Sequence, residues 1–396
     1  MKVFCVFGKY QYGDAGRGIG TEYAAFVPAL KKLGHEVVHF ESWDRSLYRN
    51  FEELNSALLG AVEKEQPQVL LTVQMHYEIW SETLRIIKNR GDVATVCWTT
   101  DDSWKYREFS RFVGHEYDAM TTTYANMIQK YHRDGIPNVL LTQWAANSEF
   151  LREPLAAREC VYPVSFIGMA HGGRKKQISF LRASGVDVAC FGHGWPVGSI
   201  EFDRIADIIN KSVISLNFSN SRGENQIKAR TFEVPGAGGF LMTQPARDLD
   251  KYYINGKEIV TFDNEKDLLE KIRYFLGNHN ERNRIAIAGY ERTIREHTYD
   301  LRLKEILEFT VHAKKCIGTC PSARSDTFKN IASRHDKTLF LRLLRPLLIW
   351  PCRVIWGRER GPRAARRIIY EFSWRVLGNK TYSASGWPGR IFYRES

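Results

Sequence analysis

Hydrophobic and polar positions along the first 300 residues follow the order of an α/β protein. Short and nearly continuous apolar runs, such as Val3–Phe7, Val69–Val73 and Ala94–Thr99, are typical of parallel strands that are covered on both faces. Between these runs lie amphipathic segments such as Thr21–Leu33 and Glu53–Glu65, which predict helices. The pattern therefore predicts a sheet of parallel strands with helices on its two sides.

A second series of strands and helices begins near Val164, after a stretch of weak periodicity at Ala146–Tyr162 that we interpret as a linker. Runs such as Val188–Phe191 and Val213–Asn217 predict strands of a second parallel sheet. We therefore expect two Rossmann-like α/β domains and an extension. The predicted parts are a first domain at residues 1–150, a second at 151–310 and a C-terminal extension at 311–396.

The composition fits two full α/β cores, because 43% of the 396 residues are hydrophobic. The segment at Lys2–Gly8 is too short for a signal-peptide core, and no uncharged apolar stretch reaches the roughly 18 residues of a membrane span. Seven cysteines without regular spacing favour a reducing compartment, so we expect a cytoplasmic protein. His312, Cys316 and Cys320 have the spacing of zinc ligands on one helix face, but no fourth ligand is evident.

The positive charge is concentrated near the C-terminus. Residues from His335 onward contain thirteen Lys or Arg and four Asp or Glu, so 13 − 4 = +9 of the net charge of +12 lies there. The segment at 340–356 mixes aliphatic side chains and tryptophans with arginines, which favours the surface of an anionic membrane. Prolines 346 and 351 predict that this segment is not one long helix.

Two alternatives to the membrane interpretation stay open. The first is that the extension completes the core of the two domains, with its arginines in water. Nucleic acid is a third possible partner, but no recognised binding motif accompanies the charge, so we expect none.

The run from Arg230 to Thr243 combines a base, an acid and a glycine break within one short segment. Arg230 suits a phosphate, and Glu233 can accept hydrogen bonds from the hydroxyls of a sugar. Gly238 and Gly239 permit a sharp turn and a close approach of the backbone to a ligand. The alternative is a helix that ends in a glycine cap before a core strand, with both charges solvated.

This order of motifs resembles the second half of GT-B glycosyltransferases of the CgeB-like, spore-maturation group. The resemblance is good over residues 163–307, looser over 1–150, and absent over 311–396. The segments that carry it are Arg230-Thr-Phe-Glu233, Gly238-Gly-Phe-Leu241, Ala288-Gly-Tyr-Glu-Arg292, His297-Thr-Tyr299 with Arg302, Thr99-Thr-Asp-Asp-Ser-Trp104 and Leu141-Thr-Gln-Trp-Ala-Ala146. The resemblance implies a GT-B architecture of two domains that face a cleft, with the nucleotide-sugar donor on the second domain.

The resemblance also implies roles for residues of the second domain. Glu233 would hold the ribose hydroxyls of the nucleotide, and Arg174 matches a recurrent arginine of the group. Together with His171, Lys228 and Arg230, Arg174 would place positive charge on the donor diphosphate, so no metal is expected. The alternative is a set of solvated basic residues at the start of a helix. Many retaining enzymes have a second glutamate eight residues before the one that corresponds to Glu233. This chain has Asn225 at that position, beside Glu224, so inversion or retention of the anomeric configuration stays open.

The first domain offers a glycine-rich loop and candidate bases. The loop contains Gly13, Gly16, Arg17, Gly18 and Gly20 just before a predicted helix, a pattern that favours an anion or acceptor but that also suits a plain tight turn. An inverting transferase needs a carboxylate that takes the proton of the acceptor hydroxyl. The carboxylates placed at strand ends are Asp14, Glu22, Asp101 and Asp102, although Asp102 could equally cap a helix.

These observations lead to one main functional hypothesis. We expect a glycosyltransferase of the hexosyltransferase type that moves a sugar from a nucleotide-diphosphate-sugar to a hydroxyl of a cell-envelope glycan or glycolipid. It would need no cofactor and would lie on the inner face of the cell membrane. The alternatives are a nucleotide-sugar epimerase on the same fold and a non-catalytic protein that binds glycan or nucleic acid.

Overall fold

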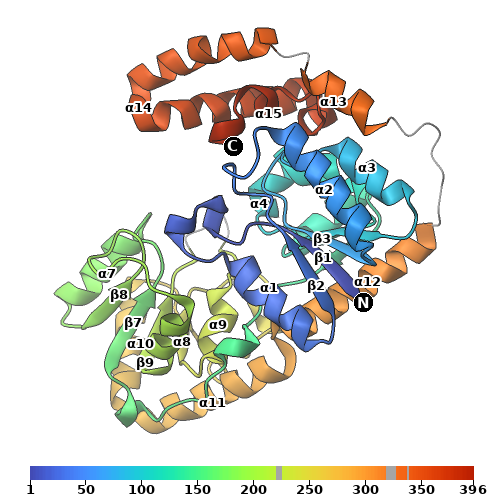
Figure 1. Cartoon of the computed structure of the whole chain (residues 1–396). Coiled ribbons are helices and arrows are strands. Elements are labelled where there is room, and N and C mark those ends of the chain that lie inside the picture. Colours follow the sequence, from blue (N-terminus) through green and yellow to red (C-terminus); the bar gives the residue numbers. More distant parts are fainter. Residues whose placement is uncertain (220–224, 318–326, 337–338) are drawn as a thin grey trace. The chain divides into compact units, whose positions relative to one another are not determined.

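A computed structural model describes the chain except for residues 220–224, 318–326 and 337–338 (Figure 1). Contacts divide it into two compact units, the first formed by Met1–Gln143 with Leu303–Ser396 and the second by Trp144–Arg302. The second unit thus begins a few residues before the predicted position of 151, and the C-terminal extension belongs to the first unit.

The first unit contains a six-stranded sheet in which every pair of neighbouring strands is parallel. The strand order is β2-β1-β3-β4-β5-β6, so the chain starts next to the edge, adds β2 on one side and then extends the sheet on the other side. Val3 pairs with Val37 on one side and with Val69 on the other. The strands are β1 (Lys2–Val6), β2 (Glu36–Phe40), β3 (Val69–Thr72), β4 (Ala94–Cys97), β5 (Ala119–Thr122) and β6 (Val139–Leu141).

Helices cover this sheet because their apolar faces pack onto buried strand residues such as Phe4, Leu70 and Met120. The helix α2 begins after Asn50, whose side chain accepts a hydrogen bond from the backbone N–H of Glu53. The helices before the linker are α1 (Thr21–Lys32), α2 (Phe51–Glu65), α3 (Ser81–Asn89), α4 (Asp102–Lys105), α5 (Arg111–Val113) and α6 (Ile128–Arg133), and a π-helical turn, η3 (Tyr106–Ser110), joins α4 to α5.

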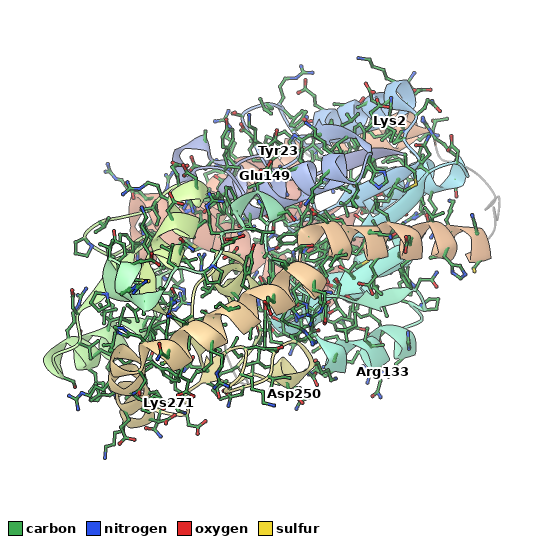
Figure 2. All side chains as sticks on the ribbon, turned by 90° about the horizontal axis from the view of Figure 1, so that it is seen from below. Lys2, Tyr23, Arg133, Glu149, Asp250 and Lys271 are labelled. Atoms are coloured by element: carbon green, nitrogen blue, oxygen red, sulfur yellow. The ribbon has the colours of Figure 1, made fainter. Side chains whose placement is uncertain are left out.

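The second unit contains a five-stranded parallel sheet of order β11-β10-β9-β7-β8. Lys271 on its helix α10, labelled in Figure 2, donates a 2.8 Å hydrogen bond to the carbonyl of Thr261 and so ties that helix to the edge strand. The strands are β7 (Tyr162–Ile167), β8 (Val188–Phe191), β9 (Ser212–Asn217), β10 (Leu241–Thr243) and β11 (Val260–Thr261). The helices are α7 (Arg174–Ala183), α8 (Phe202–Asn210), α9 (Arg230–Gly236), α10 (Glu265–Gly277) and α11 (His279–Glu296). The two predicted parallel-sheet α/β domains are thus confirmed.

The first residue of the linker is held to the end of α11 within the second unit. The backbone N–H of Ala146 donates to the carbonyl of His297 at 2.8 Å, and the carbonyl of Ala146 accepts from Tyr299 at 3.0 Å. The ring of His297 lies between the carbonyl of Tyr252 and the guanidinium of Arg302. The His-Thr-Tyr motif therefore has a structural task here, because it joins two parts of the unit that are distant in sequence.

The C-terminal extension is helical and its end packs on the first sheet. The buried side chains of Tyr370, Trp374 and Tyr382 belong to the same core as Phe109 of η3. Arg367 forms a bidentate ion pair with the buried carboxylate of Glu108, at 3.0 and 3.1 Å. The helices of this part are α12 (Tyr299–Ile317), which starts in the second unit, α13 (Phe328–Asp336), α14 (Leu339–Leu377) and α15 (Trp387–Ile391).

The prolines of α14 do not interrupt it, so that prediction is wrong. Pro346 and Pro351 lie inside helical turns, and the break falls at Gly357, which has φ 81° and ψ 174°. A glycine adopts this conformation without the steric penalty that a side chain would add. Figure 1 shows the consequence, since α14 doubles back on itself into two antiparallel arms. Throughout the described ranges, no helix has both the length and the apolar character needed to span a bilayer.

Candidate anion-binding site of the second unit

The loop from Gly168 to Gly173 leads from the carboxyl end of β7 into α7, where ligands of parallel α/β sheets bind. The first residue of α7 is Arg174, and its half-buried side chain turns back toward the strand ends. Its guanidinium donates to the carbonyl of Phe218, which follows β9, at 2.7 Å and to that of Met169 at 3.2 Å. Hydrogen bonds to the loops after two neighbouring strands thus fix the position of this cation.

Arg230 and Glu233 occupy the first turn of α9 and form an ion pair with a Nη1–Oε2 distance of 2.7 Å. About a fifth of each side chain is exposed, so the pair is partly withdrawn from solvent but accessible. Burial and then the positive charge of Arg230 on α9 lower the pKa of Arg174 on α7. Burial and the charge of Arg174 similarly lower the pKa of the exposed His171.

The structure therefore brings together four predicted residues of this unit: Arg174, Arg230, Glu233 and His171. The group contains two guanidinium groups and one carboxylate, so it is net positive and suited to an anion. Lys228 lies two residues before α9 and is half-buried. A hydrogen-bond acceptor beside two arginines is also suited to a ligand that carries hydroxyls as well as phosphate.

Polar residues that follow β9 and β10 lie at the same sheet edge and were missed in the sequence. Gln244 accepts a hydrogen bond from the backbone N–H of Ser219 at 3.0 Å, and the hydroxyl of Ser219 donates to Asn225 at 2.8 Å. Asn217 at the end of β9 donates to the hydroxyl of Thr243 at 3.0 Å. Their positions directly after apolar runs were the available signal. Glu224 lies outside the described residues.

The glycines after α9 are needed for packing within the unit. Gly238 has φ 71°, and a Cβ there would come within 2.5 Å of the carbonyl oxygen of Arg152. A Cβ at Gly239 would come within 2.5 Å of the side chain of Ile209 on α8. The structure thus supplies a reason for both glycines that does not involve a ligand.

Trp195 packs into the domain. Its indole N–H donates to the carbonyl of Gly168 at 2.8 Å, and its ring meets that of Phe166 edge-on at 6.0 Å. The hydrogen bond fixes the loop that begins at Gly168.

In the first unit, the glycine-rich loop forms two short turns, η1 (Gln11–Gly13) and η2 (Ala15–Arg17), before α1. Asp14 caps the second turn by accepting from the backbone N–H of Gly16 at 3.0 Å, and it pairs with Arg17 at 3.1 Å. Both side chains are about half exposed. Gly18 has φ 83° with no atom near its missing Cβ, and Gly20 precedes α1 as its N-cap residue. Asp14 is therefore engaged in shaping its own loop.

Asp101 and Asp102 differ in environment although they are adjacent. The carboxylate of Asp102 is buried and accepts hydrogen bonds from the hydroxyls of Thr99, Ser110 and Tyr131 at 2.6–2.8 Å. Asp102 is the first residue of α4 and not its N-cap, so the capping interpretation is wrong. A buried carboxylate saturated by three donors favours a structural role.

Asp101 is the N-cap residue of α4 and is partly exposed. Burial and, to a smaller extent, the charge of Asp101 raise the pKa of Glu22 of α1, while the charge of Lys105 lowers it. Two carboxylates and one lysine thus follow the carboxyl ends of β1 and β4. Carboxylates with such neighbours are suited to proton transfer.

A metal centre finds no support among the residues that the structure describes, where no three His, Cys, Asp or Glu side chains form a ligating group. The Sγ atom of Cys316 is 3.7 Å from Nδ1 of His312. Cys320, the third member of the predicted zinc spacing, lies outside the described residues.

Comparison with known proteins agrees with this architecture. Residues 174–308 match the model of a family described as glycosyl transferase-like. A search of curated proteins finds no match.

Solved structures share the fold at low sequence identity. Sucrose-phosphate synthase from Thermosynechococcus elongatus superposes with a TM-score of 0.58 and 12% identity, over 79% of this chain and 100% of that one. A glycosyltransferase from Rickettsia africae superposes with a TM-score of 0.54 and 11% identity, over 79% of this chain and 98% of that one. Anabaena Alr3699/HepE in complex with UDP superposes with a TM-score of 0.53 and 10% identity, over 78% of this chain and 99% of that one. The chain therefore has the predicted GT-B fold, and the family model and the fold together support a transferase.

Proposed function

We propose that the chain transfers a sugar of the hexose class from a nucleotide-diphosphate-sugar to a hydroxyl of a cell-envelope glycan or glycolipid. The observation that carries this proposal is the net positive group of Arg174, Arg230 and Glu233 at the carboxyl ends of β7 and β9. The resemblance of Arg230–Glu233 and its surroundings to CgeB-like proteins supports placing the chain in that group.

The two arginines would bind the diphosphate of the donor. Sugar transfer leaves a nucleoside diphosphate with additional negative charge on the oxygen that parts from the sugar, and fixed cations stabilise that charge in the transition state. Because guanidinium groups remain protonated, Arg174 and Arg230 can supply this stabilisation without a metal. Glu233 would accept hydrogen bonds from the ribose hydroxyls, exchanging part of its contact with Arg230 for the ligand.

The first unit would bind the acceptor and provide the base. We propose Asp101 as the carboxylate that takes the proton of the acceptor hydroxyl, because it is accessible whereas Asp102 is buried and saturated. Asp14 is the second candidate. The resulting bond joins the acceptor oxygen to the anomeric carbon, as the bond from that carbon to the diphosphate breaks.

The test begins with calorimetric titration of UDP, GDP, dTDP and CMP against the full chain. A nucleoside diphosphate should bind, and Arg174→Met should weaken this binding by about ten- to hundredfold, the loss expected for a charged hydrogen-bond partner. The matched control is Arg273→Met, which alters an exposed arginine on α10 that donates to the carbonyl of Ser184.

Product analysis with an isotopically labelled donor then separates the three functional classes. A transferase releases nucleoside diphosphate and moves the label to an acceptor. An epimerase returns a changed sugar that is still attached to the nucleotide. Neither product from a chain that binds nucleotide would indicate a non-catalytic protein and would overturn the proposal.

A further inference from the structure

The two arms of α14 have different surroundings. We call residues 339–356 the first arm and residues 358–377 the second arm, with Gly357 between them. The arms meet closely beside the turn, since a Cβ on Gly361 would come within 2.6 Å of the Cα of Arg353. The hairpin is therefore a compact element whose two arms can be considered separately (Figure 1).

The second arm is fixed to the first unit. Tyr370 and Tyr382 both donate their hydroxyls to the backbone carbonyl of Glu108, and the indole of Trp374 is buried. Among its described side chains, the first arm packs through the face on which buried Ile349 and Cys352 join a small apolar cluster with residues of the second arm and α15.

The opposite face of the first arm is also apolar, and it is exposed. Leu343, Leu347, Trp350 and Val354 follow one another at spacings of four, three and four residues, which places them along one side of a helix. These four side chains and Ile355 are 66–70% exposed. A helix that packs on one side needs only one apolar face, so a second exposed face of this size indicates an interaction surface.

The charge around this face is strongly positive. Residues 339–377 contain nine Arg and two Glu, giving 9 − 2 = +7. Exposed arginines at 353, 358, 360 and 363 lie at or beside the turn. The complementary partner must therefore combine a surface of negative charge with an apolar interior directly beneath it.

We propose that the first arm of α14 lies on the surface of an anionic lipid bilayer. Leu343, Leu347 and Val354 reach the boundary of the acyl chains, Trp350 lies at headgroup depth, and the arginines of the turn contact lipid phosphates. A second copy of this chain is disfavoured, since pairing two such hairpins would bring +7 against +7. Nucleic acid would match the charge but would leave the aliphatic side chains exposed.

This proposal concerns where the chain acts and does not depend on its chemistry. If the chain binds nucleotide but not lipid, this proposal fails and the proposed function stands. If it binds lipid but not nucleotide, the proposed function fails and this proposal stands.

The experiment is flotation of the full chain with vesicles of phosphatidylcholine alone and of phosphatidylcholine with phosphatidylglycerol. The chain should bind the anionic vesicles, and added salt should weaken this binding. The double variant Leu347→Ser/Val354→Ser should lower the partition coefficient more than about tenfold, because it removes two aliphatic side chains from the contact. Ile294→Ser/Leu301→Ser is the matched control, since it alters two exposed aliphatic residues of the second unit and should change nothing.

Two further measurements complete the design. Brominated lipids should quench part of the tryptophan fluorescence of the wild type, and Trp350→Phe should remove most of that quenching. Near-ultraviolet circular dichroism should show that the variants are folded. Equal binding of the Leu347→Ser/Val354→Ser variant and the wild type would overturn the proposal. So would equal binding to neutral and anionic vesicles, or a dimer in solution that this double variant dissociates.

Discussion

Mild acid should destabilise the second unit through one buried histidine. The side chain of His297 lies 3.0 Å from the carbonyl of Tyr252 through Nε2 and 3.1 Å from Nη2 of Arg302 through Nδ1. Because Arg302 can only donate, Nδ1 must accept, and the ring is neutral with its proton on Nε2. A second proton would have no acceptor. Burial lowers the pKa of His297 to about 4, and the charge of Arg302 contributes to the shift.

The size of this loss of stability follows from the difference between the pKa of His297 in the folded state and in the unfolded state. An unfolded histidine titrates near pH 6.5, so the shift of about 2.5 pKa units corresponds to roughly 3 kcal/mol. Since the pKa of the folded state is the lower one, the unfolded state binds more protons. The contribution to stability is therefore complete above about pH 6.5 and is lost as the pH falls from about 6.5 to about 4.

The informative variant is His297→Gln, whose amide can donate to Tyr252 and accept from Arg302 but does not titrate. Urea unfolding at about pH 7.5 and pH 5 should show that the wild type loses roughly 2 kcal/mol more than the variant, from 1.5 pH units at about 1.4 kcal/mol each. His279→Gln, at an exposed position of α11, serves as the control. An identical loss in the wild type and His297→Gln would refute the assignment of acid sensitivity to this residue.

Three further predictions concern the second unit and the proposed chemistry. Glu233→Ala and Arg230→Ala should each weaken binding of the nucleotide by roughly 1.5–3 kcal/mol, measured by calorimetry, and unchanged affinity in folded variants would contradict the proposed site. Transferase activity should persist in EDTA; a loss that manganese or magnesium restores would show that a metal is required. Arg282→Met should destabilise the unit by about 3 kcal/mol in urea, because it leaves the carbonyls of Leu155, Ser212 and Val213 without their donor, whereas an unchanged midpoint would show that water replaces the guanidinium.

The sequence predicted the strands well because both faces of these sheets are buried. β8 has the predicted bounds of Val188–Phe191, and this run is short, apolar and followed by a break. Helix starts were less certain, as in α2, which begins at Phe51 instead of the predicted Glu53. Such a boundary depends on local hydrogen bonds more than on the spacing of apolar residues.

The candidate site was predictable only where a charged residue comes after a predicted strand in the sequence. Arg174 and Glu233 follow that rule, and the structure brings them together. Asp101 and Asp102 have the same sequence signal, yet only the fold shows that Asp102 is enclosed by Ser110 and Tyr131, which come from later in the chain. Similarly, Arg367 and Glu108 are 259 positions apart, so no periodicity could predict their ion pair.

The C-terminal extension shows why a single interpretation of an amphipathic segment can be too simple. Tyr370, Trp374 and Tyr382 complete the core of the first unit, whereas Leu347 and Trp350 face outward from the first arm. Deleting everything after about residue 333 would therefore expose the core as well as remove the outward face, and loss of membrane binding in that fragment would have two explanations. Substitutions confined to the outward face of the first arm change the proposed contact with the bilayer. They leave the Arg367–Glu108 ion pair and the buried aromatic side chains in place, so they test that contact itself.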